Sequence, residues 1–228
     1  MEALVLTVVL TSVPLILAAT GELIAEKSGV LNLGVEGMML MGAVAAFAVT
    51  SLSGNPYFGI ISGALAGGIT AGVFAVFALA LATNQVATGL ALTIFGAGLS
   101  GLIGAPYVGG TIEGLSILAI PFLSELPVLG SLFFKLDPLA YFSVLMLATV
   151  GFFLNNTRAG LILRAVGNNH DSAHALGYSV LQVRCGAVVF GGIMAGLAGA
   201  YLPLVLTPHW SEGMTAGRGW IALALVVF

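Results

Sequence analysis

The sequence predicts an all-α fold, a polytopic bundle of membrane-spanning helices, and three observations indicate this class. Of the 228 residues, 59% are hydrophobic and only 7% are charged, whereas a soluble domain carries about 25% charged residues. The 76 residues between Glu36 and Glu113 contain no Asp, Glu, Lys or Arg, and about 20 apolar residues cross a bilayer as a helix. The 32 glycines suit close helix packing in lipid. With a net charge of −3 and one cysteine, the chain is neither disordered, nor a nucleic-acid binder, nor a disulfide-stabilised secreted domain.

The first predicted span covers residues 3–21. The chain begins with Met1 and Glu2, an acid where a secretory signal peptide has Lys or Arg, and no A-x-A cleavage site follows. We therefore expect a first span that is retained. A polar segment, 21–32, follows it and contains Glu22, Glu26 and Lys27.

Five further complete spans are expected in order. The second ends at the turn-forming sequence Ser53-Gly-Asn-Pro56. A short break at 83–85 separates the third from the fourth, and the longest loop, 106–138 with Pro121, Glu125 and Pro127, precedes the fifth. The ranges are 33–52, 58–82, 86–105, 139–154 and 185–206.

A seventh span begins at 220–228 and has only nine residues. At 1.5 Å per residue these reach about 14 Å, roughly half of the hydrocarbon core. We therefore expect the sequence to be truncated at its carboxyl terminus, with about seven spans present in a single transmembrane domain over 1–228.

The most polar segment, 155–184, determines the predicted orientation. It holds three of the four arginines, and cytoplasmic segments are enriched in Lys and Arg. We expect this segment in the cytoplasm, which puts the amino terminus and the 106–138 loop outside. Four basic residues then lie inside (Lys27, Arg158, Arg164 and Arg184) and two outside (Lys135 and Arg218).

Small-xxx-small repeats at 63–67, 68–72 and 192–196 predict close backbone contacts between helices, because small residues supply the packing in lipid. The aromatic residues near span ends are expected to anchor in the membrane interface. They are Tyr57, Tyr107, Trp210 and Trp220.

Polar residues in or beside the spans are candidates for a functional site, since a charge at the bilayer centre costs at least about 2.5 kcal/mol. Glu36 is the only acidic residue inside a predicted span, and Asn32, Asn84 and Gln85 lie at span ends. Two interpretations of Glu36 stay open. Its carboxylate is either satisfied near the interface by water or by N–H groups at the helix start, or it belongs to an internal cavity or gate.

Several catalytic patterns are missing. Lys27-Ser28 is preceded by Glu26 instead of Gly, so the phosphate-binding motif G-x-x-x-x-G-K-[ST] does not occur. His170 and His174 have the spacing of H-E-x-x-H zinc proteases, but Asp171 takes the place before the spacer where the catalytic Glu would stand. We expect no metal site and no enzyme. Cys185 heads an apolar span and is expected to be a small buried residue.

Three separated sequence blocks resemble the permease subunits of ATP-binding-cassette importers for simple sugars and nucleosides, in the branched-chain and ribose-type permease superfamily. The blocks are GELIAEKSGVLNLGVEGMML at 21–40, NQVATGL at 84–90 and MTAGRGWIALA at 214–224. Members of that family continue past the last block. The resemblance implies a helical fold of the type II importer class.

The cytoplasmic segment RAVGNNHDSAHALG, 164–177, is similar to the coupling loop of such permeases and its E-A-A-x-x-x-G pattern, and the resemblance implies a coupling loop over about 155–181. Asp171 and Ser172 depart from that pattern, which puts the strength of coupling in question more than its existence. The resemblance assigns contact with ATPase subunits to Arg164, Gly167, Asp171, Ser172, Ala173 and Gly177. A Gly at the end of a short helix can adopt a positive φ.

The resemblance implies a permease that moves a nucleoside or simple sugar by alternating access, in a plasma or inner membrane. Its expected partners are two cytoplasmic ATPase subunits that bind the ATP, a second permease subunit, and an extracytoplasmic solute-binding protein. No cofactor is expected on this chain. The alternative is an ion-coupled secondary transporter or channel, which needs carboxylates inside the spans. Asn32, Glu36, Asn84 and Gln85 are the candidate substrate-path residues.

Overall fold

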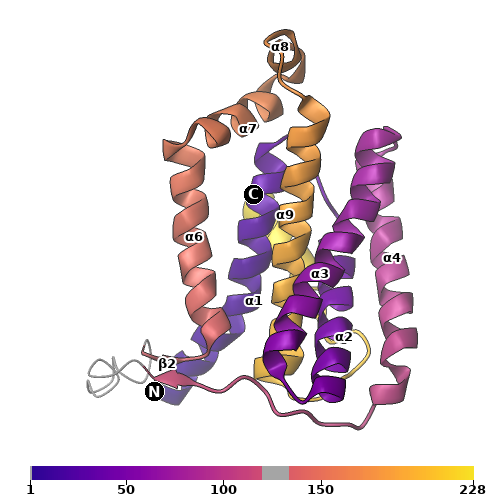
Figure 1. Cartoon of the computed structure of the whole chain (residues 1–228), viewed down its shortest axis with the longest axis vertical. Helices are drawn as coiled ribbons and strands as arrows, with labels where there is room; N and C mark the ends of the chain where they lie inside the picture. The colour runs from indigo at the N-terminus through magenta and orange to yellow at the C-terminus, as the bar shows by residue number, and fades with distance from the viewer. Residues whose placement is uncertain (1, 120–133) are drawn as a thin grey trace.

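The computed structural model describes residues 2–119 and 134–228, and most of this part of the chain is helical. Residues 120–133 of the predicted outer loop, with Pro121, Glu125 and Pro127, lie outside the described residues. The long helices stand side by side in one bundle (Figure 1).

In chain order the elements are α1 (Glu2–Lys27), α2 (Val35–Ser53), α3 (Pro56–Ala75), the π-helix η1 (Val76–Ala80), α4 (Gln85–Gly104), the 3-10 helix η2 (Ala105–Tyr107), β1 (Leu118–Ala119), β2 (Lys135–Leu136), α6 (Pro138–Asn156), α7 (Arg158–Asn168), α8 (His170–Ala175), α9 (Val180–Tyr201), the π-helix η4 (Leu202–Leu206) and α10 (Arg218–Val227).

Six helical stretches in the described residues are long and apolar enough to cross a membrane, which confirms the predicted fold class. The predicted seventh segment forms α10, a helix of only ten residues. The six stretches are Leu4–Lys27, Val35–Ser53, Pro56–Ala80, Gln85–Tyr107, Pro138–Asn156 and Val180–Leu206.

Two helix boundaries differ from the prediction. α1 continues past residue 21 to Lys27, so Glu22 and Glu26 lie on its last turns instead of in a loop. α9 begins at Val180 and therefore includes Arg184. Hydropathy marks where a helix would leave lipid, whereas the helix itself ends where the backbone must turn, as at Gly29 with φ +82°.

The centre of the bundle is a contact among α2, α3 and α9 in which glycines replace side chains. A Cβ on Gly67 would overlap Gly192 and Gly196 of α9, and a Cβ on Gly42 of α2 would overlap Gly196. Two of the three predicted repeats, 63–67 and 192–196, therefore face each other. The 68–72 repeat makes no such backbone contact, because a Cβ on Gly68 would meet only the side chain of Ile193 (3.0 Å) and a Cβ on Gly72 would meet nothing within 4 Å.

A short antiparallel pair of strands lies at the end of the bundle that also holds the amino terminus. In it Leu118 pairs with Leu136 and Ala119 with Lys135. Asp137 follows, caps α6 by accepting the N–H of Ala140 (2.9 Å) and accepts the buried hydroxyl of Tyr201 on α9 (2.8 Å). The outer loop is thus tied to the core by a carboxylate that is 3% exposed.

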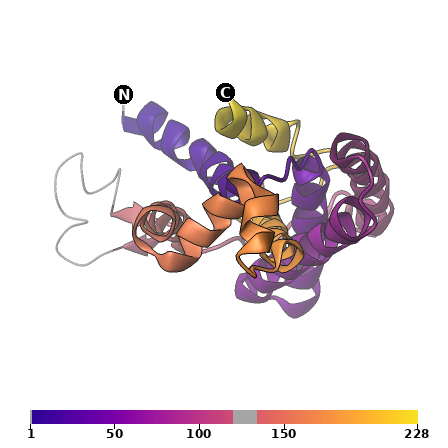
Figure 2. The same ribbon diagram turned by 90° about the horizontal axis from the view of Figure 1, so that it is seen from above.

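The opposite end of the bundle carries α7 and α8. Viewed from that end, α7 lies across the bundle between α6 and α8 (Figure 2). The amino terminus and β2 lie at the far end (Figure 1). The predicted separation of the 155–184 segment from the amino terminus and the 106–138 loop is therefore present in the structure.

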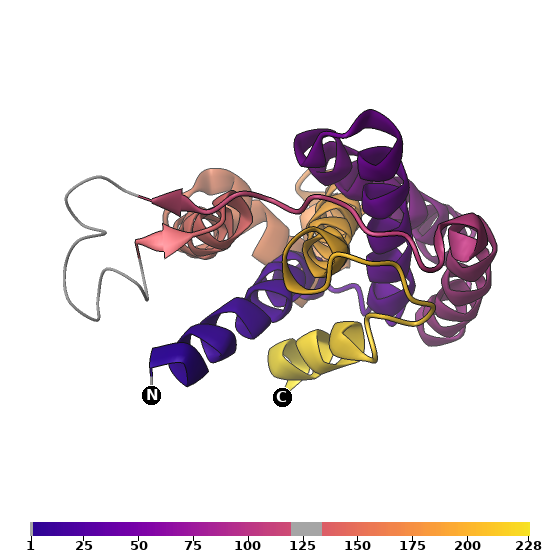
Figure 3. The same cartoon turned by 90° about the horizontal axis from the view of Figure 1, so that it is seen from below.

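Two non-helical segments enter the bundle. Residues 28–34 connect α1 to α2, and residues 207–217 connect η4 to α10. Figure 3 shows the second segment leaving α9, passing toward α4 and returning to α10, which lies beside α1. The segment therefore folds back into the bundle, and α10 begins inside it.

Candidate functional site

The side chain of Glu36, in the first turn of α2, is buried and accepts three hydrogen bonds from the segment that leads into α10. Oε1 accepts the hydroxyl of Thr215 (2.6 Å) and the N–H of Gly217 (2.8 Å), while Oε2 accepts the N–H of Gly219 (2.6 Å). A Cβ on Gly219 would come within 2.6 Å of the Glu36 Cα. Only glycine at that position lets the two backbones approach closely enough for these bonds.

The position of Glu36 along α4 shows how deep in the bundle this site lies. Its neighbour Gly37 packs on α4 so closely that a Cβ would sit 2.9 Å from the Cα of Thr93. Thr93 lies about 12 Å along the helix from Gln85 and about 16 Å from Gly104, at 1.5 Å per residue. Glu36 therefore lies beside the middle of α4, far from both ends of that helix, although it belongs to the first turn of α2.

Two helix N-termini meet at this carboxylate. The unpaired N–H groups at a helix start carry a partial positive charge that favours an anion. Glu36 belongs to the first turn of α2 and binds the first turn of α10. Its carboxylate is thus satisfied by backbone N–H groups at a helix start, but mainly at the start of a helix that is remote in sequence.

Arg218 lies at the same place, although the sequence placed it in an outer segment. It is the first residue of α10, and its Nη1 donates to the carbonyl oxygens of Met214 (3.2 Å) and Thr215 (3.1 Å). The prediction for Arg218 is wrong because the 207–217 segment turns inward instead of staying at the surface. Trp210 was likewise expected at the interface, but its ring is 2% exposed and packs with Val44 and Phe47 of α2.

A second buried carboxylate contacts the segment that leads into α2. Glu22 on α1 is 1% exposed, and its Oε1 accepts the N–H of Asn32 (3.3 Å). Its Oε2 has no hydrogen-bond partner in the described part of the chain. The expectation that Glu36 is the only acidic residue inside a span is therefore wrong, since Leu4–Lys27 includes Glu22.

The other candidate path residues occupy different positions. Asn32 is fully buried and its Oδ1 accepts the N–H of Gly34 (3.0 Å), so it shapes the entry into α2. Asn84 is exposed and caps α4 by accepting the N–H of Ala87 (3.0 Å). Gln85 joins α4 to the 28–34 segment by accepting the N–H of Leu31 (3.0 Å). The structure thus brings Asn32 close to Glu22 and leaves Asn84 at the helix end.

The predicted coupling loop forms α7 and α8. Asp171 and Ser172 are exposed on α8. Ala173 is only 2% exposed, so its side chain packs against other residues of this protein. Gly177 has φ +88° and donates to the carbonyl of His174 (2.9 Å), while the N–H of Tyr178 reaches the carbonyl of Ala173 (3.2 Å). These two bonds are the Schellman pattern that ends a helix.

α7 is attached to the end of α1 by a close backbone contact. A Cβ on Gly167 would overlap the carbonyl of Lys27 and lie 3.1 Å from the N of Gly29. Beside it, Nε of Arg184 on α9 donates to the carbonyl of Ser28 (3.1 Å). Arg164 is half-buried on α7, and its Nε has no hydrogen-bond partner among the described residues. α7, α1 and α9 therefore meet at one point.

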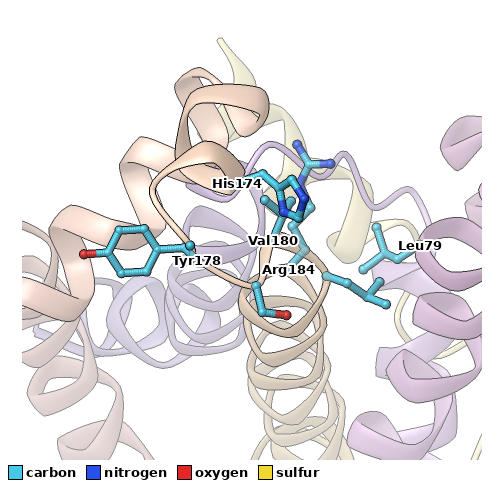
Figure 4. A pocket seen from close by; sticks show the side chains of 8 residues that line it. Leu79, His174, Tyr178, Val180 and Arg184 are labelled. Atoms are coloured by element: carbon cyan, nitrogen blue, oxygen red, sulfur yellow. The ribbon is translucent and has the colours of Figure 1, made fainter.

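A cavity of about 520 Å³ lies beneath α8, and His174, Tyr178 and Arg184 are among its lining residues. In the close view the Tyr178 ring points away from His174 and Arg184 (Figure 4). The Nε2 of His170 lies 3.4 Å from Asp171. Within residues 2–119 and 134–228 no three His, Cys, Asp or Glu side chains gather as metal ligands would.

Sequence reasoning missed the partners of Glu36 and the pair formed by Asp137 and Tyr201. The sequence did hold a sign of the close approach to Glu36, because residues 213–219 contain three glycines in and beside a block that resembles the family. No local pattern links Asp137 to Tyr201, which are 64 residues apart.

Comparison with known proteins agrees with this architecture. The family described as branched-chain amino acid transport system / permease component matches residues 4–228. No solved structure matches significantly.

Three curated relatives are similar over nearly the whole chain. The putative glucose ABC transporter permease protein TsgC13 of Haloferax volcanii is 44% identical over 94% of this chain and 66% of its own length. The nucleoside ABC transporter permease protein NupC of Lactococcus lactis is 31% identical over 100% of this chain and 75% of its own length. The guanosine ABC transporter permease protein NupQ of Bacillus subtilis is 30% identical over 94% and 71%. The chain thus spans about two thirds to three quarters of these relatives.

Proposed function

Because this chain belongs to the family of permease components of the branched-chain amino acid transport type, we propose that it is the membrane-spanning permease subunit of an ATP-driven importer for nucleosides or simple sugars. The observation that carries the proposal is the family match over residues 4–228, on a chain with six membrane-spanning helices among its described residues. Relatives named for glucose, nucleoside and guanosine transport support the solute class. The chain is a multi-pass membrane protein and is not itself an enzyme.

The proposed complex has four kinds of member besides the lipid. This permease pairs with a second permease subunit, which we take to be a paralogue. Two cytoplasmic ATPase subunits bind the ATP and dock on the end that carries α7 and α8. A solute-binding protein delivers the solute to the opposite end, and no cofactor is held by this chain.

The α7–α8 unit is the proposed coupling element. Asp171 and Ser172 are its exposed contact residues. Ala173 packs inward, and Gly177 ends the helix. Gly167 transmits movement to α1 because its backbone touches the turn after Lys27. Arg164 lies on the same helix. A displacement of α8 by an ATPase subunit is therefore transmitted to α1 and α9 through these close contacts, as alternating access requires.

The proposed solute path runs beside the central site. Asn32 and Glu36 shape its wall from within the bundle, and Gln85 and Asn84 lie at the end of α4 toward α7–α8. Glu36 acts there through the hydrogen bonds that hold α10, because three donors already occupy its carboxylate.

The test is uptake of radiolabelled guanosine and of radiolabelled glucose into proteoliposomes that contain the assembled importer. We expect uptake that requires ATP, the ATPase subunits and the binding protein. A Walker-motif variant of the ATPase subunits is the control and should abolish uptake. Uptake driven by a proton or sodium gradient without ATPase subunits would contradict the proposal and favour the ion-coupled alternative.

A further inference from the structure

We propose that Glu212 and the non-helical segment around it, residues 211–216, form a water-exposed wall of the solute path that hydrogen-bonds the hydroxyl groups of a neutral polyol such as a sugar ring. The inference rests on the proposed transport function and adds a binding site to it. The segment lies on the side of the bundle formed by α2 and α4.

The segment runs along α4 from one end of that helix toward its middle. Trp210 lies against Gly104 at one end of α4, and the carboxylate of Glu212 lies against Gly101, one turn further along. Thr215 reaches Glu36, which is near the middle of α4. The segment therefore runs from the end of α4 to its centre as a series of turns, in which Met214 donates its N–H to the carbonyl of Ser211 (3.3 Å) and Ala216 donates to that of Gly213 (2.9 Å).

The first residues of the segment are exposed. Non-helical backbone at membrane depth is tolerated only where it is buried in protein or lines water, because lipid cannot satisfy its N–H and C=O groups. Ser211, Glu212 and Gly213 are all exposed in this chain. A charged side chain that faced hydrocarbon would also be costly. If this face contacts water, the backbone groups can form hydrogen bonds with water and the charged side chain avoids hydrocarbon.

The segment is held firmly at both ends. The buried ring of Trp210 anchors its start against α2, and Ile112 donates its N–H to the carbonyl of Pro208 (3.2 Å). Glu36 holds its far end through Thr215 and Gly217. A binding group on such a support loses little conformational freedom when solute binds.

The charges around the segment favour a neutral solute. The Glu36 carboxylate offsets the positive end of α10, and Arg218 is engaged with backbone carbonyls. Glu212 does not belong to any ion pair in the described part of the chain. A free carboxylate repels anions and accepts hydrogen bonds from hydroxyl groups, which are stronger when the acceptor is charged. Hydroxyl-rich neutral solutes fit this site best.

The experiment measures water access at single cysteines in the full importer. Cys185, the sole native cysteine, is first replaced by Ser. Glu212→Cys and Ser211→Cys are then compared with Leu102→Cys, whose position on α4 is also strongly exposed (74%) and which we assign to the lipid-facing surface. The probe is a membrane-impermeant, positively charged methanethiosulfonate.

We expect labelling at positions 211 and 212, at least tenfold faster than at 102, and slower labelling when glucose or guanosine and its binding protein are saturating. Labelling at 212 no faster than at 102 would overturn the proposal. In uptake assays we expect Glu212→Gln to raise KM at least fivefold and Glu212→Asp to restore part of the loss. An unchanged KM would also overturn it. Because the energy source is measured on the unmodified importer, failure of this proposal is distinguishable from failure of the transport function.

Discussion

The carboxylate of Glu36 accepts the hydroxyl of Thr215 over 2.6 Å, although the two residues are 179 positions apart in the chain. This bond joins the first turn of α2 to the segment that folds back toward α10. Together with the N–H groups of Gly217 and Gly219, it gives α10 a fixed starting point inside the bundle.

Removal of the Glu36 carboxylate should destabilise the protein. Glu36→Ala leaves three donors, two of them buried, without an acceptor, and each hydrogen bond to a charged group contributes about 1.5–3 kcal/mol. We expect a clear fall in Tm in detergent, and a smaller fall for Thr215→Val, which removes one donor. A double-mutant cycle should show that the two effects are not additive. Equal Tm for Glu36→Ala and the unmodified protein would contradict the role assigned to this carboxylate.

Substitution at the central glycine contact should separate helices α3 and α9. Gly196→Val places a side chain where the backbone of Gly63 and Gly67 lies, and overpacking of a tight core typically costs about 1–3 kcal/mol. Gly186→Val is the matched control on the same helix, because a Cβ there would meet nothing within 4 Å. We expect lower Tm and less folded protein by size-exclusion chromatography for Gly196→Val only. A comparable loss for both variants would show that helix propensity, and not the α3–α9 contact, causes the effect.

Tyr201→Phe should loosen the attachment of the outer loop. The variant leaves one oxygen of the buried Asp137 without its hydroxyl donor, at a cost of about 1–3 kcal/mol, while the cap on α6 through Ala140 remains. Tyr141→Phe is the control, since its hydroxyl makes only longer contacts (3.3 Å) with the backbone of Leu118 and Leu136. Thermal unfolding should show the larger shift for Tyr201→Phe, and the reverse order would be inconsistent with this attachment.

Gly177→Val should weaken docking of the ATPase subunits without blocking membrane insertion. A φ of +88° is strained for a residue with a side chain, by about 1–2 kcal/mol, so the end of α8 should rearrange. The measurement is co-purification of the ATPase subunit with the permease from membranes. Gly151→Val, at a helical position with open space around it, should retain the ATPase. Wild-type recovery of the ATPase with Gly177→Val would refute the coupling assignment.

A bulkier side chain at position 173 tests the same unit from its inner side. Ala173 is 2% exposed, so Ala173→Leu should displace α8 from the rest of the chain, whereas Ser172→Leu alters only the exposed face. If α8 docks the ATPase, both variants should reduce co-purification, but only Ala173→Leu should also lower Tm. Unchanged co-purification in both would argue against α8 as the docking element.

The sequence was a good guide to the spans and a poor guide to the site. The uncharged run after Glu36 became α2, α3 and α4 with boundaries close to those expected, because the cost of placing a charge in lipid acts on each segment locally. Gly63, Gly67, Gly192 and Gly196 also met as their spacing predicted. Arg218 and Trp210 were misplaced, since a surface connection and a segment that folds inward have the same local composition.

By itself the sequence determined that this protein is a helical membrane bundle, which segments cross, and which family its blocks resemble, because these depend on residue type along short stretches. Only the tertiary structure decided what Glu36 binds, how deeply Glu22 is buried and where Glu212 lies. Those outcomes depend on the route of the non-helical 28–34 and 207–217 segments through the bundle. That route is set by the combined packing of α1, α2, α4 and α9, which no single stretch of sequence contains.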